Sequence, residues 1–380
     1  MLRQAERYDF TLLCIDLTSY LRTQYGLRDS NDKRFVQTNQ LFEYYHRVYV
    51  AENLAEELYT MFIVRLVNNR SAQQQVHLLA IAYYARLASE LKNYQSYKLN
   101  MYAYMIGLMR YTPVNDHEQA LRYCEEAIQF FKARPYIAQV PLQIFIYQHL
   151  MSNIHLRRFE EAKQSALACP EFMQEGTFNW FKFKEIHLLL LLRIRQYASA
   201  GEELASALNH PRFAFLPDNA KELWRIYESY IYYLSLMKRM VFPMKGKKFK
   251  MGKFINEIPI FSKDKSGMNI AVLIIKFLSL LQEHKFSRVF DEIEALEQYS
   301  YRHLRGKDTQ RSYYFLKMLL QIPVGRFDAQ EANAKAERYL TMLKSIPVQL
   351  DNQAREIEII PYEDLWDCVL DSLKEDPMLA

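Results

Sequence analysis

Apolar side chains recur every three or four residues along most of the chain, which is the spacing that places them on one face of a helix. Residues 140–169 show this pattern twice, on either side of a short corner at residues 156–158. The residues before the corner are Ile144, Tyr147, Met151 and Ile154, and those after it are Phe159, Ala162, Ala166 and Cys169. Because small residues let a second helix approach closely, the stretch predicts two antiparallel helices packed as a hairpin.

The N-terminal part has the same helical period without a visible repeat. Residues 2–25 predict a single helix whose apolar stripe is Phe10, Leu13, Leu17 and Leu21. The DSND turn at residues 29–32 offers capping side chains for a long helical stretch over residues 33–68. We expect residues 1–95 to form an N-terminal helical cap.

The corner pattern then returns at a spacing near forty residues. Ala120, Ala162 and Ala200 each follow an aromatic residue by three positions, at intervals of 42 and 38 residues. Val289 follows Phe286 in the same way, 89 residues after Ala200, and Phe327 marks a degenerate last unit. A period near forty with two helices in each unit is typical of an α-solenoid.

This corner motif resembles the second helix of tetratricopeptide repeats. Its residues are Phe159, Ala162, Ala166 and Cys169 in one unit and Tyr197, Ala200, Leu204 and Ala207 in the next. The first helices lack the Trp–Leu–Gly pattern of that family, and the period exceeds its roughly 34 residues. The resemblance implies an all-α fold, a right-handed superhelical array of antiparallel helical hairpins, whose concave face usually binds a partner.

The array geometry implied by the resemblance places a set of side chains on the groove face of the first helices. They are Tyr102, Met105, Met109, Tyr147, Met151, His155, Lys182, Glu185 and Arg193. Tyrosine, methionine and arginine are effective interface residues because each brings a large contact area. The alternative is that Tyr147 and Met151 belong to the core.

A basic segment interrupts the repeats at residues 238–267. Prolines and glycines break any long helix there, and by the interval count the segment replaces the second helix of one unit. We therefore expect helical hairpins at 96–237, a basic insertion or hinge at 238–267, and degenerate hairpins with an acidic terminal helix at 268–380. The candidate anion-binding residues of the insertion are Lys245, Lys247, Lys248, Lys250 and Lys253.

Three phenylalanines, Phe242, Phe249 and Phe254, alternate with these lysines. Such a composition can hold a phosphate backbone while aromatic rings stack on bases. No recognised nucleic-acid-binding motif accompanies it. Four alternatives remain: a structural loop whose rings tuck beneath it or that docks on the acidic tail, a protein-binding loop, a nucleic-acid-binding loop, and a loop that binds anionic lipid.

The last thirty residues carry nine acids and two bases, a net charge of −7 in a chain whose total is +5. From Pro361 onward the spacing predicts an amphipathic helix that Trp366 anchors to the last hairpin. The predicted apolar face is Tyr362, Leu365, Trp366, Val369 and Leu370, and the predicted outer acids are Asp364, Asp367, Asp371 and Glu375. We expect these acids to screen the lysine-rich loop.

Known catalytic signatures are missing from the sequence. The glycines at 246 and 252 have the wrong spacing for a phosphate loop, and no HExxH or GxSxG motif occurs. The four cysteines form no CxxC pair, the histidines do not cluster, and no apolar run reaches the roughly 20 residues of a membrane span. We therefore expect a cytoplasmic protein that is not an enzyme and uses no cofactor and no metal.

These patterns favour a non-enzymatic interaction scaffold or regulatory subunit that holds a protein or peptide partner in the solenoid groove. The alternative is a nucleic-acid-associated regulator that uses the lysine-rich loop at residues 238–253.

Overall fold

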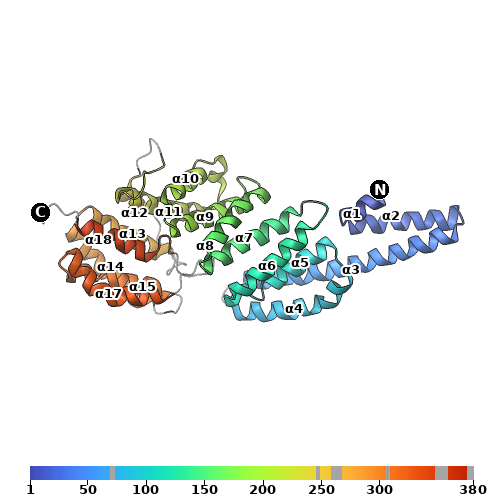
Figure 1. Ribbon diagram of the computed structural model, residues 1–380, viewed down its shortest axis with the longest axis horizontal. Helices are drawn as coiled ribbons and strands as arrows, with labels where there is room; N and C mark the ends of the chain where they lie inside the picture. The colour runs from blue at the N-terminus through green and yellow to red at the C-terminus, as the bar shows by residue number, and fades with distance from the viewer. Residues whose placement is uncertain are drawn as a thin grey trace. The chain divides into compact units, whose positions relative to one another are not determined.

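The computed structural model describes residues 1–68, 73–244, 249–257, 268–304, 306, 309–346 and 358–374. Every regular element among these residues is helical (Figure 1), so the predicted all-α class is confirmed. Within the described part, no helix combines the length and the apolar character that a membrane crossing requires.

The chain divides into two compact units, Met1–Phe172 and Met173–Ala380. The finer boundaries expected at residues 95, 237 and 267 stay predictions. Unit 1 contains α1 (Leu2–Arg7), α2 (Thr11–Thr23), the π-helical turn η1 (Gln24–Arg28), α3 (Asp32–Asn68), α4 (Gln73–Asn93), α5 (Tyr97–Leu108), η2 (Thr112–Val114), α6 (His117–Lys132), α7 (Gln139–His155), α8 (Phe159–Ala168) and η3 (Cys169–Phe172).

Unit 2 begins with α9 (Phe178–Arg193), α10 (Tyr197–Leu208), η4 (Pro211–Phe215) and α11 (Asp218–Leu236). The remaining helices are α12 (Met251–Glu257), α13 (Met268–Gln282), α14 (Phe286–His303), α15 (Gln310–Leu319), α16 (Gln321–Val324), α17 (Ala329–Ser345) and α18 (Tyr362–Lys374). Each of the pairs α9 and α10, α13 and α14, and α15 and α17 is in contact.

A recurring corner explains the repeat in the sequence. Six corners each contain a residue with left-handed backbone, with φ between 51° and 58°, and the next N–H donates to the carbonyl five residues back. That hydrogen bond is typical of a Schellman motif, and it follows the end of the preceding helix or, at Asn115, of the turn η2. The left-handed residues are Asn115, Arg157, Arg195, Lys238, His284 and Arg326, at intervals of 42, 38, 43, 46 and 42 residues.

The predicted starts of the second helices are confirmed. His117, Phe159, Tyr197 and Phe286 are the first residues of α6, α8, α10 and α14. The small residues that follow them, such as Ala120, Ala162 and Ala200, are completely buried. Phe327 lies at the predicted last corner but before α17, where its ring packs on Phe286 with centroids 4.5 Å apart.

The expected single helix over residues 2–25 is wrong, because Asp9 adopts a left-handed conformation (φ 54°) that separates α1 from α2. The carboxylate of Asp9 accepts a hydrogen bond of 2.7 Å from the Tyr136 hydroxyl. The Phe10 N–H also donates to the Ala5 carbonyl five residues back, as at the six corners, so the break is of the same kind. The stretch predicted over residues 33–68 is one continuous helix, α3, and Asn31 of the DSND turn accepts from the Arg34 N–H at its start.

Candidate functional site

Helix α2 exposes the side that the sequence marks as apolar. It pairs with the first half of α3 to form an N-terminal helical hairpin (Figure 1). The side chains of Phe10, Leu13 and Tyr20 are 57%, 45% and 62% exposed. The face against α3 instead carries Thr11, Cys14 and Thr18, all buried. Of the predicted stripe, Phe10 and Leu13 are thus exposed on the face away from α3, together with Tyr20, whereas Leu17 and Leu21 are half-buried.

Polar contacts hold the inner face of α2 in place. The Thr11 hydroxyl donates to Glu52 Oε1 on α3 at 2.7 Å, and the Thr18 hydroxyl donates to the Cys14 carbonyl of its own helix at 2.6 Å. Burial raises the pKa of Glu52, and the Thr11 hydrogen bond opposes that shift. The guanidinium of Arg22 lies 3.7 Å above the centre of the Phe42 ring. The Thr11–Glu52 and Arg22–Phe42 contacts thus join α2 to α3.

A second apolar stripe follows α3 and is covered only in part. Its C-terminal section is buried under α4 and α5, whereas Leu41 and Tyr44 at its N-terminal end are exposed. The stripe keeps the alternating spacing of four and three residues that helices use for lengthwise packing. Its members are Leu41, Tyr44, Val48, Ala51, Ala55, Leu58 and Phe62. An additional helix would continue the contact that α5 already makes.

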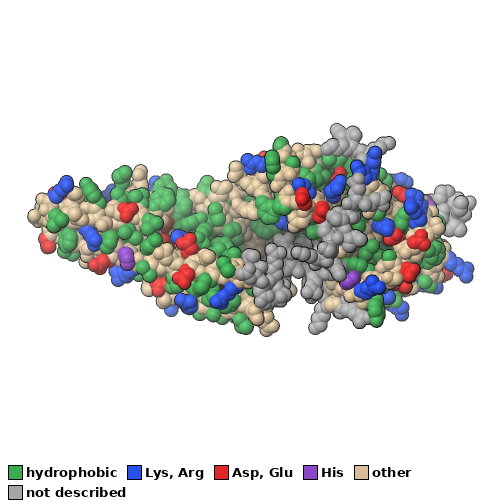
Figure 2. All heavy atoms as spheres, turned by 180° about the vertical axis from the view of Figure 1, so that it is seen from behind, with side chains coloured by type: hydrophobic (Ala, Val, Ile, Leu, Met, Phe, Trp, Pro, Cys, Tyr) green, Lys and Arg blue, Asp and Glu red, His purple; other side chains and the backbone are tan. Residues whose placement is uncertain are grey.

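Aromatic rings border the open surface where both stripes reach the start of α5. Tyr8 lies between Phe10 and Tyr136, with ring centroids 6.0 Å and 5.7 Å away. On α3, Tyr44 meets the ring of Tyr94, three residues before α5, at 5.9 Å. More than half of the large hydrophobic side chains that are exposed in the described part of the chain belong to residues 1–81. Figure 2 shows such side chains spread over this unit.

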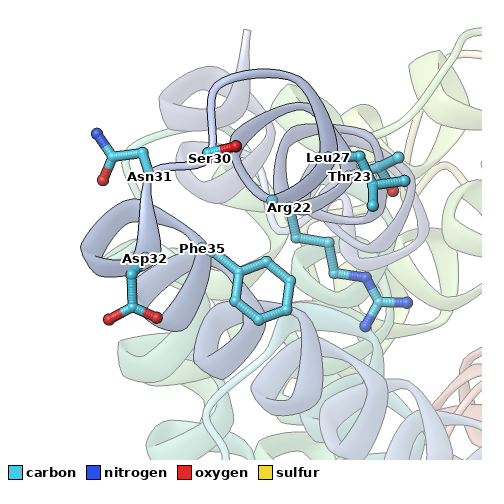
Figure 3. Close-up of a pocket in the computed structure, with 8 residues that line it drawn as sticks. Arg22, Thr23, Leu27, Ser30, Asn31, Asp32 and Phe35 are labelled. Carbon is cyan, nitrogen blue, oxygen red and sulfur yellow. The ribbon is translucent and has the colours of Figure 1, made fainter.

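The tip of the hairpin holds a pocket of about 540 Å³ beside the π-helical turn η1. In Figure 3, Phe35 and Arg22 lie inside it, whereas Asn31 and Asp32 point outward. Arg22 also donates to Asn39 at 3.0 Å, so its charge already has partners. With Leu27 exposed at the rim, this pocket suits a bulky side chain of a partner better than a charged small molecule.

The predicted groove residues of unit 1 lie on α5 and α7. Tyr102 donates to Glu56 on α3 at 3.2 Å, and Met105 and Met109 are half-buried. On α7, Met151 is buried, as the core alternative expects, whereas Tyr147 and His155 are half-buried. The ring of His155 stacks on His117 with centroids 4.0 Å apart.

The predicted groove residues of unit 2 lie on α9. Glu185 is buried and accepts from Lys182 at 2.9 Å and from the Tyr227 hydroxyl at 3.2 Å. Arg193 donates to the Glu358 carbonyl at 3.3 Å. The predicted groove residues therefore fall in two units, some in unit 1 and some in unit 2. One continuous groove along all of them stays a prediction.

The basic insertion is described in part. Lys250 and Lys253 are exposed, whereas Lys245, Lys247 and Lys248 lie outside the described residues. The rings of the insertion turn inward. Phe242 and Phe249 pack on Tyr232 of α11 at 5.4 Å and 5.2 Å, and Phe254 is buried. The rings that base stacking would need are therefore used within the fold.

Two histidines bridge neighbouring helices at equivalent repeat positions. His149 Nδ1 lies 2.7 Å from the Ser165 hydroxyl, and 38 residues later His187 Nδ1 donates to Glu203 Oε1 at 2.8 Å. Burial lowers the pKa of His149. Ser165 also donates to the Glu161 carbonyl of its own helix at 3.0 Å. These contacts connect α7 to α8 and α9 to α10, so the two histidines stabilise the helical hairpins.

No family model, curated protein or solved structure matches this chain. Any function must therefore be inferred from the geometry described above. Sequence reasoning identified an apolar stripe on α2 but did not predict which face of the helix packs on α3. The signal that could have indicated that face is the set of Thr11, Cys14 and Thr18 at helical spacing, small residues that allow close approach to α3.

Proposed function

We propose that the chain is a non-enzymatic protein-interaction module, a tetratricopeptide-like solenoid of antiparallel hairpins that acts as a scaffold or regulatory subunit. The six corners at intervals of 38–46 residues support the solenoid. The buried state of all four cysteines, none of them in a disulfide, suits a reducing cytoplasm.

The observation that carries the proposal is the outward apolar stripe of α2. A surface of this kind, bordered by aromatic rings, typically marks a protein-binding site. Phe10, Leu13, Leu17 and Tyr20 follow a spacing of three and four residues, which matches a helix better than an extended peptide. The partner we propose is therefore an amphipathic helix that packs lengthwise on the α2–α3 hairpin. The groove residues Tyr102, Met105 and Met109 would extend the contact.

The nucleic-acid alternative has less support, because Phe242, Phe249 and Phe254 pack within the protein. Lysines alone would still allow salt-sensitive binding to phosphate.

The test is a photo-crosslinking experiment in the native cell. A crosslinking amino acid at position 20 should capture a defined protein, and Leu13→Lys should reduce the captured amount by about tenfold, because a charge at the centre of an apolar interface costs about 1.4 kcal/mol or more.

Leu167, an isolated leucine of α8 that is also exposed, provides the matched control. A crosslinker at position 167 should capture no defined protein, and Leu167→Lys should leave capture at position 20 unchanged. Equal capture by the wild type and Leu13→Lys would contradict the proposal. Circular dichroism should be identical for all variants, since both leucines are exposed.

A further inference from the structure

The C-terminal segment Glu358–Lys374 lies across several helices of unit 2. Its helix, α18, contacts α13, α15 and α17 (Figure 1). Tyr362 stacks on Phe315 of α15 at 4.4 Å and shares a 2.6 Å hydrogen bond with Ser312. The Trp366 Nε1–H donates to Asn333 on α17 at 3.0 Å. The predicted helix and the anchoring role of Trp366 are thereby confirmed.

The start of the segment is fixed by a buried arginine. Arg311 of α15 is 3% exposed and contacts both carboxylate oxygens of Glu358, at 2.7 Å and 2.8 Å. It also donates to Glu363 at 2.7 Å and to the carbonyls of Leu343 and Ile346. Glu358 in turn accepts from the Tyr362 N–H at 3.0 Å, so the same carboxylate caps α18.

The acids along α18 meet arginines at two of the recurring corners. Asp364 is buried and accepts from Arg195, the left-handed residue between α9 and α10, which also lies 3.6 Å from Asp367. Asp371 accepts from Arg239, directly after the corner that ends α11. The expectation that Asp364 lies outside is therefore wrong, because Arg195 and the Tyr197 hydroxyl donate hydrogen bonds to its carboxylate. The acids at positions 364, 367 and 371 have the i, i+3, i+7 spacing of one helix face.

We infer that this surface of unit 2 is a receptor for an acidic amphipathic helix and that α18 is its resident ligand. Arg195 and Arg239 recognise carboxylates at the edge of the helix, and Asn333 recognises a tryptophan on its inner face. A partner helix with acids and a tryptophan at the same spacing would fit the surface once α18 leaves it. This site is separate from the α2–α3 surface and does not depend on the function proposed for that surface.

The exposure of the contacts indicates where exchange begins. The side chains of Arg239 and Asp371 are 39% and 43% exposed, so water reaches the later half of α18. In the first turn, Asp364 is buried although its partner Arg195 is 62% exposed. Arg311 and Glu358 at the other end are buried. The ligand therefore opens from its C-terminal end and is released last at Arg311.

The experiment uses the full chain with a protease recognition sequence placed within residues 347–357. After cleavage, the fragment that carries α18 should stay bound, and a fluorescein-labelled peptide of residues 358–374 should replace it, as measured by anisotropy. The uncut chain should bind the peptide far more weakly, because the tethered helix competes at high effective concentration.

Specificity is tested with matched peptides. An Asp364→Asn, Asp371→Asn peptide should bind about tenfold more weakly, and a peptide of residues 11–23, the other 13-residue amphipathic helix, should not bind. Arg195→Glu in the cut protein should weaken binding of the unsubstituted peptide. A peptide that carries Asp364→Arg should restore binding to this variant. A fragment that never exchanges, a body that unfolds when the fragment leaves, or equal binding of the Asn-substituted peptide would each overturn the inference.

Discussion

Helices α2 and α18 are both amphipathic and both 13 residues long, yet they present opposite faces to the protein. On α18 the apolar residues are buried and three Asp residues line the edge. On α2 the apolar side chains Leu12, Leu13 and Tyr20 are exposed, and two threonines and a cysteine are buried. Leu365 is 0% exposed, whereas Leu13, at a comparable place in its helix, is 45% exposed.

The difference shows that amphipathic spacing identifies which face of a helix is apolar but not what covers it. Helix α18 lies across α13, α15 and α17, which bury it. Helix α2 has α3 on one side, and the small side chains of Thr11, Cys14 and Thr18 allow close contact there. Four predictions test this contrast, beginning with the largest expected effect.

Arg311→Met should lower the free energy of unfolding of unit 2 by about 3–5 kcal/mol, because it leaves the Glu358 carboxylate buried without its cation. All three tryptophans of the chain lie in unit 2, so their fluorescence during urea unfolding reports on this unit. Arg288→Met, at an exposed position of α14, should change the value by less than about 0.5 kcal/mol. Equal effects would show that the buried ion pair is not required.

Leu365→Ala should cost unit 2 about 3 kcal/mol through lost burial and the cavity left behind. Leu13→Ala should cost unit 1 less than about 0.5 kcal/mol, since that side chain is already in water. Unit 1 contains no tryptophan, so its unfolding is followed by circular dichroism. The relevant part of that signal is the change that occurs without a change in tryptophan fluorescence. A large loss for Leu13→Ala would mean that the stripe of α2 is covered within the chain.

Thr11→Val should destabilise unit 1 by about 1–2 kcal/mol, because the buried Glu52 loses a donor. Thr18→Val should be close to neutral, since the Thr18 hydroxyl bonds only to carbonyls of its own helix in the described contacts. Both variants keep the shape of the side chain. The same loss for both would indicate that Thr11 acts by packing alone.

Glu52→Gln should stabilise unit 1 at neutral pH by less than about 1.5 kcal/mol. Burial raises the pKa of Glu52 from 4.5, so the folded state favours the neutral acid. The contribution of Glu52 to stability is therefore fully present below pH 4.5 and is lost as pH rises through the raised pKa. Urea titrations at several pH values should show a weaker pH dependence for Glu52→Gln. An unchanged slope would contradict the raised pKa.

The sequence alone determined the local structure of the repeats. His117, Phe159, Tyr197 and Phe286 mark helix starts because each follows a corner and precedes small residues at helical spacing. The helix at the acidic end and the burial of Trp366 could also be predicted, since both follow from spacing and side-chain size. The helix starts depend on contacts between residues close in sequence, and the burial of Trp366 follows from the size of its ring.

Tertiary structure decided the rest, because the deciding contacts join distant residues. The Asp9 carboxylate accepts from Tyr136, which lies 127 positions away, and the buried Asp364 accepts from Arg195, which lies 169 positions away. Periodicity carries no information about such partners. A helical pattern fixes the direction of each side chain around its own axis, but only the placement of neighbouring helices determines which direction loses contact with water.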